Sequence, residues 1–200
     1  MSMPLFLACV ASYLIGSIPN GLIFGKLFWG VDLREHGSHN IGATNAWRTL
    51  GKGPGFLIFF LDFLKGVCGV YLGSLTDSSP TSLVLGGLMA IVGHSCSLFL
   101  RFKGGKGVAT GLGVIAMLMP KTTILIFLLW FLLVYFTGYV SLGSVVAASF
   151  VPFLAWWGHE PEAYIVFGIT AAIFVIYRHK TNIQRLLAGT ESKIKAGKRS

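Results

Sequence analysis

Long apolar segments make up most of this chain and decide what it can fold into. A helix that crosses the hydrocarbon core of a bilayer needs about 20 mostly apolar residues, and residues 3–25, 54–75 and 81–100 meet that requirement. Only 12% of the 200 residues are charged, against about 25% in an ordinary soluble domain. Most of the chain therefore cannot face water, and we predict an all-α, polytopic membrane helical bundle.

The stretch 108–177 is also apolar, but turn-forming residues divide it. Pro120, Gly138 and the segment 158–161 interrupt it, and such residues mark the ends of helices. The resulting runs cover residues 108–120, 122–136, 139–157 and 162–177. Four helices here bring the total to seven transmembrane helices, which is our prediction. The alternative is two longer spans in this stretch and five helices in all.

Lys and Arg gather in three segments outside the apolar runs. Of the 16 such residues, four lie in residues 26–53, three in 101–107 and seven in 178–200. Cytoplasmic loops of membrane proteins collect Lys and Arg, so we place all three segments on the cytoplasmic side. An even number of spans then separates each segment from the next, which puts the N-terminus outside and the C-terminus in the cytoplasm. We expect residues 1–190 to form a single transmembrane domain and residues 191–200 to form a basic C-terminal tail.

The composition gives no reason to expect a metal site or a disulfide framework. Three cysteines lie in apolar runs without metal-ligand spacing, and we interpret them as small buried apolar residues. The five His are scattered, with no HExxH motif.

The first polar segment, residues 37–48, mixes glycines, hydroxyls and amides with one Arg. Together these residues offer backbone donors, side-chain donors and a bidentate cation, a set that suits a phosphate group. The alternative is a polar loop whose residues cap a helix. The candidate ligand-binding residues are Ser38, Asn40, Thr44, Asn45 and Arg48.

The second polar segment, residues 102–110, is a Gly-Lys-rich turn that precedes an apolar run. Glycine lets the backbone approach a ligand closely, and the N-terminus of the following helix is a ready anion site. The segment is not a Walker A loop, because Gly107 stands where Ser or Thr is required, so nucleotide hydrolysis is not expected. The alternative is a flexible loop. The candidates are Lys103, Gly104, Gly105, Lys106 and Gly107.

The third polar segment, residues 178–186, follows the last apolar run directly. His179 and Asn182 are three residues apart and would share one face of a continuing helix. His179 is the best general base by residue type, although a positively charged flank with an incidental His is the alternative. Because all three segments lie on the same side in our topology, we predict one anion-binding site built from all of them.

Two charged residues and one His lie within the apolar runs. Asp62 and Lys65 are three apart, and charges inside a membrane are costly and usually face the interior of a bundle. We predict a structural ion pair between them, near the site, and a structural hydrogen bond for His94.

These motifs together resemble the bacterial acyl-phosphate:glycerol-3-phosphate acyltransferases, a family of polytopic inner-membrane enzymes. The match runs nearly end to end, with two departures: His39 stands where the family usually has Gly, and Ser97 where it usually has Pro. The residues that carry the resemblance are Gly16-Ser17-Ile18-Pro19, Gly37-Ser38-x-Asn40-x-Gly42-Ala43-Thr44-Asn45-x-x-Arg48, Leu61-Asp62-x-Leu64-Lys65-Gly66, Gly93-His94 with Phe102-Lys103-Gly104-Gly105-Lys106-Gly107-Val108-Ala109-Thr110, and Arg178-His179-x-x-Asn182-Ile183-x-Arg185-Leu186-x-x-Gly189-Thr190-Glu191.

The resemblance implies transfer of a fatty acyl group from acyl phosphate to the 1-hydroxyl of glycerol-3-phosphate. The products would be lysophosphatidic acid and phosphate, in the first acylation step of phospholipid synthesis. It also implies a multi-pass protein of the bacterial inner membrane with its active site on the cytoplasmic face. The expected partners are the two substrates and membrane lipid, with no cofactor, no metal and no nucleic acid, and we expect a monomer.

Under this hypothesis the candidate residues take separate roles. Arg48 and Lys106 would hold phosphate oxygens, and the turn 104–107 would seat the glycerol-3-phosphate headgroup. Ser38, Thr44 and Asn182 would donate hydrogen bonds, while Ser144 is a weaker donor suggested by the resemblance. His179 would bind phosphate or accept the proton of the attacking hydroxyl, and the substrate's own phosphate is the alternative base. Direct transfer does not require Ser38 as an acyl-accepting nucleophile.

Two other classes of protein share parts of this pattern, an anion transporter and another kind of lipid enzyme. An anion transporter would also place basic loops and buried charges in a helical bundle, but it would move phosphate without making lipid. Acyltransferases with a His-x4-Asp motif are excluded because no His is followed by Asp five residues later. Phosphatidyl transferases with four clustered Asp are excluded because the chain has three Asp, at 32, 62 and 77.

Overall fold

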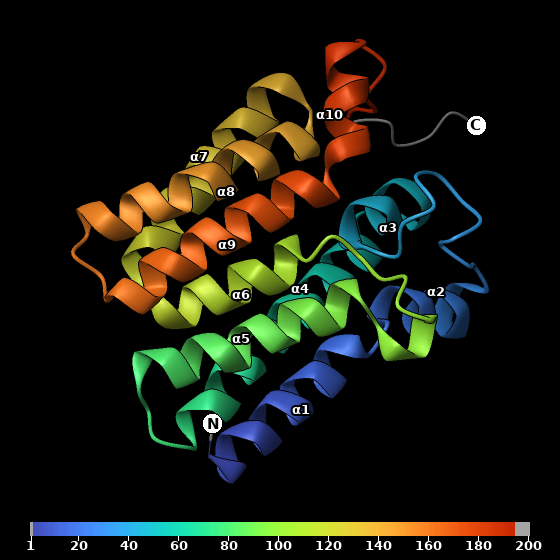
Figure 1. The fold of residues 1–200 in the computed structure, drawn as a ribbon. Helices are drawn as coiled ribbons and strands as arrows, with labels where there is room; N and C mark the ends of the chain where they lie inside the picture. The colour runs from blue at the N-terminus through green and yellow to red at the C-terminus, as the bar shows by residue number, and fades with distance from the viewer. Residues whose placement is uncertain (1, 195–200) are drawn as a thin grey trace. The chain divides into compact units, whose positions relative to one another are not determined.

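The computed structural model of the chain describes residues 2–194, and the regular secondary structure of those residues is all helical, with no β-strand (Figure 1). Contacts divide the chain into two compact units, Met1–Met117 and Leu118–Ser200, which we call the first and second unit. The helices are α1 Met3–Ser17, α2 Asn20–Trp29, α3 Ala43–Leu50, α4 Lys52–Ser74, α5 Pro80–Ser95, the 3-10 helix η1 Leu98–Leu100, α6 Val108–Leu118, α7 Pro120–Thr137, α8 Val140–Trp157, α9 Glu162–Arg178 and α10 Lys180–Leu187.

The helices agree closely with the predicted apolar runs. Within residues 2–194, five helical segments are long and apolar enough to cross a bilayer, and six are if the bent pair α9 and α10 is one span. The four runs predicted between residues 108 and 177 are present as α6, α7, α8 and α9. Because α6 has only 11 residues, shorter than a usual span, the total of seven membrane spans stays a prediction.

A break after Ser17 divides the first predicted run into α1 and α2. The residue before a proline is disfavoured in helical conformation, and Ile18, which precedes Pro19, has an extended ψ of 118°. The break exposes the Ile18 carbonyl, which accepts a hydrogen bond from the Nζ of Lys65 in α4. A buried Lys therefore reaches a backbone carbonyl at the break, which also accepts from the backbone N–H of Asn20 at 3.0 Å.

Two short helices, α3 and α10, were not predicted as separate elements. Each has eight residues, several of them polar, so neither produces the long apolar run from which the other helices were recognised. The α3 helix packs against the start of α4, where a side chain at Gly55 would meet the backbone of Trp47. The first polar segment is therefore half loop and half helix.

Closely packed helices form the first unit. Gly69 and Gly73 of α4 face Gly86 and Ser82 of α5 so closely that no side chain would fit at either α4 position, as the Gly-x-x-x-Gly spacing predicts. The hydroxyl of Ser97 donates to the Ser17 carbonyl across 2.5 Å and ties the end of α5 to the end of α1.

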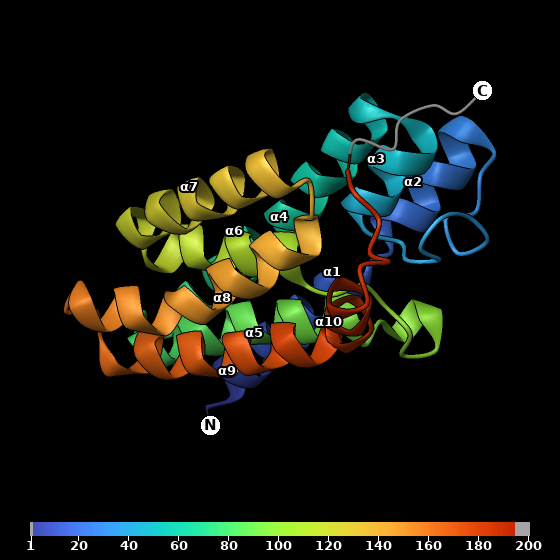
Figure 2. The same ribbon diagram turned by 90° about the horizontal axis from the view of Figure 1, so that it is seen from above.

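Figures 1 and 2 both show α2, α3 and the segment between α5 and α6 at one end of the first unit. The first and second polar segments therefore lie at the same end of this unit. This is the arrangement that a shared membrane side requires of them.

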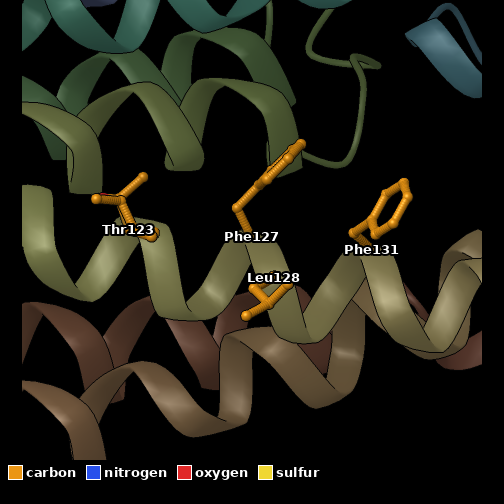
Figure 3. A pocket seen from close by; sticks show the side chains of 5 residues that line it. Thr123, Phe127, Leu128 and Phe131 are labelled. Atoms are coloured by element: carbon orange, nitrogen blue, oxygen red, sulfur yellow. The ribbon is translucent and has the colours of Figure 1, made fainter.

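The second unit contains α7 to α10. Figures 1 and 2 show α8 and α9 side by side, joined by a tight turn that begins at Gly158. A pocket of about 500 Å³ on α7 is lined by Thr123, Ile124, Phe127, Leu128 and Phe131 (Figure 3). The Thr123 hydroxyl donates to the Met119 carbonyl within the helix. The pocket therefore presents hydrocarbon and is suited to lipid tails rather than to phosphate.

Candidate active site

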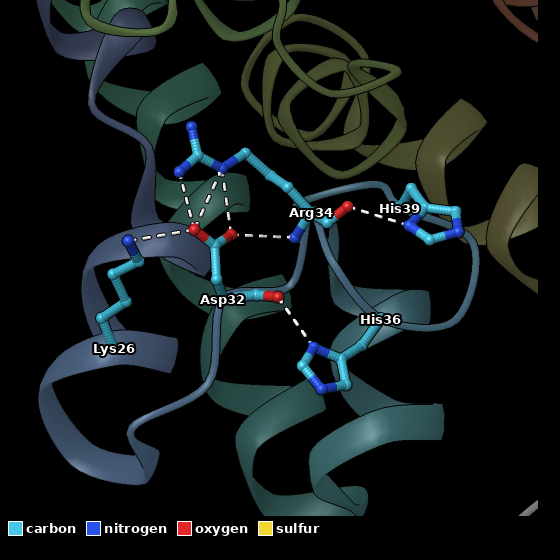
Figure 4. Close-up of polar contacts among 5 residues, drawn as sticks. All are labelled: Lys26, Asp32, Arg34, His36 and His39. Carbon is cyan, nitrogen blue, oxygen red and sulfur yellow. Dashed lines mark hydrogen bonds and ion pairs between the residues drawn. The ribbon is translucent and has the colours of Figure 1, made fainter.

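Asp32 anchors the loop that leads into α3. Its carboxylate accepts from the guanidinium of Arg34, with the shortest contact at 2.6 Å, and lies 3.0 Å from the Nζ of Lys26 (Figure 4). The hydrogen bonds from Arg34, followed by that from Lys26, hold the pKa of Asp32 well below its usual range, although burial opposes them. Lys26 and Arg34 therefore hold the loop through their ion pairs with Asp32. No sequence motif indicated this cluster.

Asn45 organises the same loop from inside. Its Nδ2 lies within 3.0 Å of the carbonyl oxygens of Leu33, His36 and Asn40, and its Oδ1 accepts from the backbone N–H of Ser38. An amide has two N–H donors, and here both face backbone carbonyls. The side chain, 2% exposed, therefore shapes the loop, whereas the sequence suggested that it contacts substrate.

The remaining candidates of this segment lie around α3. The Asn40 side chain accepts from the backbone N–H of Gly42 at 2.8 Å and so forms the turn just before the helix. Thr44 and Arg48 are four residues apart in α3 and share one helix face; both are half-buried. Ser38 is exposed in the loop. The loop thus carries the hydroxyl group of Ser38, and the helix that follows it carries the hydroxyl group of Thr44 and the guanidinium of Arg48.

The two departures from the family pattern have local explanations. His39 has a φ of +58°, a conformation that glycine adopts readily and other residues adopt at a cost. Its Nδ1 donates to the Arg34 carbonyl at 2.9 Å, which partly offsets that cost (Figure 4). Ser97 has a φ of −62°, close to the value that a proline ring imposes. Both backbone conformations therefore suit the residues that the resemblance leads us to expect there, Gly and Pro.

The Gly-Lys turn is fixed to the end of α5. The backbone N–H of Gly104 donates to the Ser95 carbonyl at 3.1 Å, and that of Gly105 donates to the His94 carbonyl at 3.0 Å. These two amides were expected to face a ligand, but they hold the turn against α5 instead. Gly107 has a φ of +77°, so it is required for its conformation.

Three groups of the second segment are suited to binding an anion: the side chains of Lys103 and Lys106, and the N-terminus of α6. Lys106 is half-buried and Lys103 is exposed. The N-terminus of α6 begins at Val108, and the first N–H groups of a helix have no acceptor within that helix.

In the second unit, His179 lies at a bend of 61° between α9 and α10. A single continuing helix, on which His179 and Asn182 would share one face, is not formed, because α10 starts anew at Lys180. The Nδ1 of His179 lies 2.8 Å from the Val175 carbonyl, and a carbonyl can only accept. The Nδ1 therefore carries the proton, which leaves Nε2 as the basic nitrogen of the neutral ring.

Glu191 joins three side chains of the second unit. Its carboxylate accepts from Asn182 at 2.6 Å, from Ser141 at 2.8 Å and from Arg185 at 2.7 Å. Burial opposes ionisation of this carboxyl, but the three hydrogen bonds outweigh it and lower the pKa of Glu191. Glu191 belongs to the quoted motif, yet its role was missed because we placed it at the start of the tail. Of that tail, residues 195–200 lie outside the described part of the chain.

Ser144 lies one turn after Ser141 in α8. Its hydroxyl donates to the Val140 carbonyl at 2.8 Å and accepts from Trp130 at 3.4 Å. It would have to exchange at least one of these bonds to bind a substrate.

The structure thus assembles the candidates in two groups. In the first unit, one end carries Ser38, Asn40, Thr44, Asn45, Arg48, Lys103, Gly104, Gly105, Lys106 and Gly107. In the second unit, Asn182 and Glu191 are bonded to each other, with His179 just before α10 and Ser144 one turn along α8. Among the described residues, no group of three or more His, Cys, Asp or Glu is arranged to hold a metal ion.

The family model described as glycerol-3-phosphate acyltransferase matches residues 6–189. The chain belongs to this family. The glycerol-3-phosphate acyltransferase of Fusobacterium nucleatum subsp. nucleatum is 46% identical over 193 residues, which cover 96% of this chain and 100% of the relative. Glycerol-3-phosphate acyltransferase 2 of Moorella thermoacetica is 49% identical over 194 residues, covering 97% and 98%.

Solved structures of the glycerol-3-phosphate acyltransferase family share this fold. The crystal structure of PlsY (YgiH), an integral membrane glycerol 3-phosphate acyltransferase, in its glycerol 3-phosphate form matches with a TM-score of 0.90 and 40% identity over 94% of both chains. Its lysophosphatidic acid form matches with a TM-score of 0.88 and 39% identity, again over 94% of both chains. The predicted family is confirmed, and this chain is a membrane glycerol-3-phosphate acyltransferase.

Proposed function

We propose that this acyltransferase takes its acyl group from acyl phosphate and transfers it to the 1-hydroxyl of glycerol-3-phosphate. The products are 1-acyl-glycerol-3-phosphate, which is lysophosphatidic acid, and inorganic phosphate. The observation that carries the proposal is the likeness, over 94% of both chains, to an acyltransferase solved in glycerol 3-phosphate and lysophosphatidic acid forms. Acyl phosphate is an activated donor that needs neither a cofactor nor a carrier protein, so positioning and charge stabilisation suffice as catalysis.

The reaction is a single displacement at the acyl carbonyl. The 1-hydroxyl oxygen forms an ester bond to the carbonyl carbon, and the bond from that carbon to the phosphate oxygen breaks. The proton of the hydroxyl passes to Nε2 of His179 or to the departing phosphate. The hydrogen bond from Nδ1 to the Val175 carbonyl supports His179 in this role, because it places the proton on Nδ1 and makes Nε2 the acceptor nitrogen of the neutral ring.

Arg48 and Lys106 neutralise phosphate oxygens, since an Arg fork and a Lys ammonium both bind phosphate strongly. Ser38, Thr44 and Asn182 supply hydrogen bonds, with Lys103 at the periphery and Ser144 as a weaker donor. Asn45, Gly104 and Gly105 shape the two loops, because the Asn45 amide and the backbone N–H groups of the two glycines are bonded within the protein. Asn40 forms the turn before α3 through its Oδ1 and offers its Nδ2 to substrate. Gly107 provides the turn into α6, whose N-terminus favours an anion.

The membrane arrangement that we propose has seven spans, with α6 and the pair α9–α10 among them. The distribution of Lys and Arg supports an outside N-terminus, a cytoplasmic C-terminus and a cytoplasmic active site. We place the protein in the bacterial inner membrane as a monomer. The family match is continuous from residue 6 to 189, which supports treating residues 1–190 as one functional domain.

The test is an assay of purified protein in lipid with radiolabelled glycerol-3-phosphate and either acyl phosphate or acyl-CoA. We expect lysophosphatidic acid from acyl phosphate only, and equal use of acyl-CoA would refute the donor assignment. The Arg48→Ala variant should lose about 100-fold or more in kcat while remaining folded. The matched control is Lys52→Ala, an exposed basic residue at the start of α4. An acyl group trapped on Ser38 would contradict direct transfer.

A further inference from the structure

A buried chain of polar side chains runs beneath the Gly-Lys turn of the first unit. Oδ1 of Asp62 lies 2.8 Å from Nζ of Lys65, 3.1 Å from Nδ2 of Asn20 and 3.7 Å from Nδ1 of His94. Their exposed fractions are 7% or less. The carboxylate thus links α2, α4 and the end of α5 at one atom, and the proposed reaction uses none of these four residues.

His94 connects this cluster to the turn in two ways. Its backbone carbonyl accepts from the N–H of Gly105. Its ring lies directly under the same residue, because a Cβ built on Gly105 would overlap Nε2 of His94. Gly105 does not have a positive φ, unlike Gly107. Glycine is therefore required at position 105 for the room that the His94 ring occupies, and not for its backbone conformation.

The ring and the turn consequently behave as one packed unit. Nδ1 of His94 lies on the Asp62 side of the ring at 3.7 Å, beyond hydrogen-bond distance, and Nε2 lies under Gly105. The ring therefore fixes the position of the turn by packing. Lys106 and the N-terminus of α6 follow directly after Gly105. A displacement of about 1 Å at a binding group can lower the rate of an enzyme by a factor of about 100. The position of the turn therefore matters for phosphate binding.

We propose that His94, packed under Gly105 and beside Asp62, is a positioning residue that holds the Gly-Lys turn where it binds the phosphate of glycerol-3-phosphate. The inference rests on the proposed assignment of this turn to glycerol-3-phosphate. It adds that the position of the turn is determined from inside the membrane part of the first unit, by a ring that does not itself touch the substrate.

The experiment is a double-mutant cycle of His94→Ala and Gly105→Ala in the full-length protein in detergent. Binding of glycerol-3-phosphate is measured by the rise of Tm with its concentration, which needs no acyl donor. Activity assays then give KM for each substrate. A third single variant, His94→Asn, keeps an amide nitrogen near the Nδ1 position opposite Asp62. The control is His159→Asn, which changes an exposed His in the turn between α8 and α9.

We expect Gly105→Ala to weaken glycerol-3-phosphate binding about tenfold or more, because the added methyl group lifts the turn. In the His94→Ala background the same change should cost less than about twofold, since the ring that it meets is gone. His94→Asn should bind more tightly than His94→Ala. KM should rise for glycerol-3-phosphate and stay within about twofold for the acyl donor. If Gly105→Ala does not fold, recovery of folded protein in the double variant is the equivalent result.

Additive effects of the two changes, or an equal rise of both KM values, would overturn the inference. The Lys106→Ala variant separates this failure from a failure of the proposed function. If Lys106→Ala weakens glycerol-3-phosphate binding while the cycle is additive, only the role of His94 is wrong. If Lys106→Ala leaves binding unchanged, the turn is not the phosphate site and both assignments fall.

Discussion

The side-chain amide of Asn182 donates to Oε1 of Glu191 at 2.6 Å, and both residues are buried. Glu191 also accepts from Ser141 and Arg185, so one carboxylate orients three side chains from α8 and α10. The first prediction tests this arrangement by exchanging the amide of Asn182 and the carboxylate of Glu191.

Glu191→Gln should destabilise the protein by about 1–3 kcal/mol, because it removes charge-assisted hydrogen bonds. Asn182→Asp should destabilise it more, since it sets a second carboxylate against the first. The reversed pair, Asn182→Asp with Glu191→Gln, should recover part of that loss, because an amide again faces a carboxylate. The measurement is Tm in detergent. A double variant less stable than Asn182→Asp alone would contradict the assignment.

The second prediction concerns pH and Asp32. Its pKa is lowered in the folded protein by Arg34 first and Lys26 second, so folding favours the ionised form. The stability that this contributes is fully present above the unfolded pKa of about 3.9 and is lost as pH falls through the lower folded pKa. The difference in Tm between the protein and Asp32→Asn should therefore be constant above about pH 5 and shrink below about pH 4. If the difference in Tm grew towards acid pH instead, the pKa of Asp32 would be raised by folding and the prediction would be wrong.

The third prediction concerns the buried pair Asp62 and Lys65. Lys65→Met leaves the Asp62 carboxylate buried without its cation and removes one of the two donors to the Ile18 carbonyl, so we expect a loss of about 3–5 kcal/mol of stability. Adding Asp62→Asn removes the uncompensated charge and should restore part of that stability. Thermal unfolding of the single and double variants measures this. Equal stability of the two variants would mean that the pair is not coupled.

The fourth prediction concerns His39 and its φ of +58°. His39→Ala loses the hydrogen bond to the Arg34 carbonyl and keeps the strained backbone, whereas His39→Gly loses the bond and relieves the strain. The Gly variant should therefore be more stable than the Ala variant by about 1 kcal/mol, the reverse of the order at an ordinary position. Comparing the Tm values of the two variants tests the conformation directly.

Local hydrophobicity made the helices predictable. Runs such as 54–75 and 139–157 appear as α4 and α8 almost residue for residue, because an apolar stretch must leave water wherever the rest of the chain lies. The Asp62–Lys65 pair could also be predicted, since two opposite charges three residues apart on a buried helix face have few other partners. The short helices α3 and α10 were missed because eight polar-rich residues carry no such signal.

The assignment of individual polar groups could not be predicted in the same way. Asn45 was expected at the substrate and instead holds a loop, and the amides of Gly104 and Gly105 donate to α5. Glu191 was placed in the tail and instead bonds Asn182. Each motif states which donors are present, but not whether the protein or a ligand accepts from them.

The sequence by itself determined that the chain is a membrane helical bundle of this acyltransferase family, and which segments carry polar groups suited to phosphate. These properties depend on composition and on motifs that are contiguous in the chain. Only the tertiary structure decided which donors shape the loops and which nitrogen of His179 is basic. It also showed that the ring of His94 lies under Gly105. Those outcomes depend on hydrogen bonds and packing that exist only in the folded chain, and a donor already bonded within the fold must exchange that bond to reach a substrate.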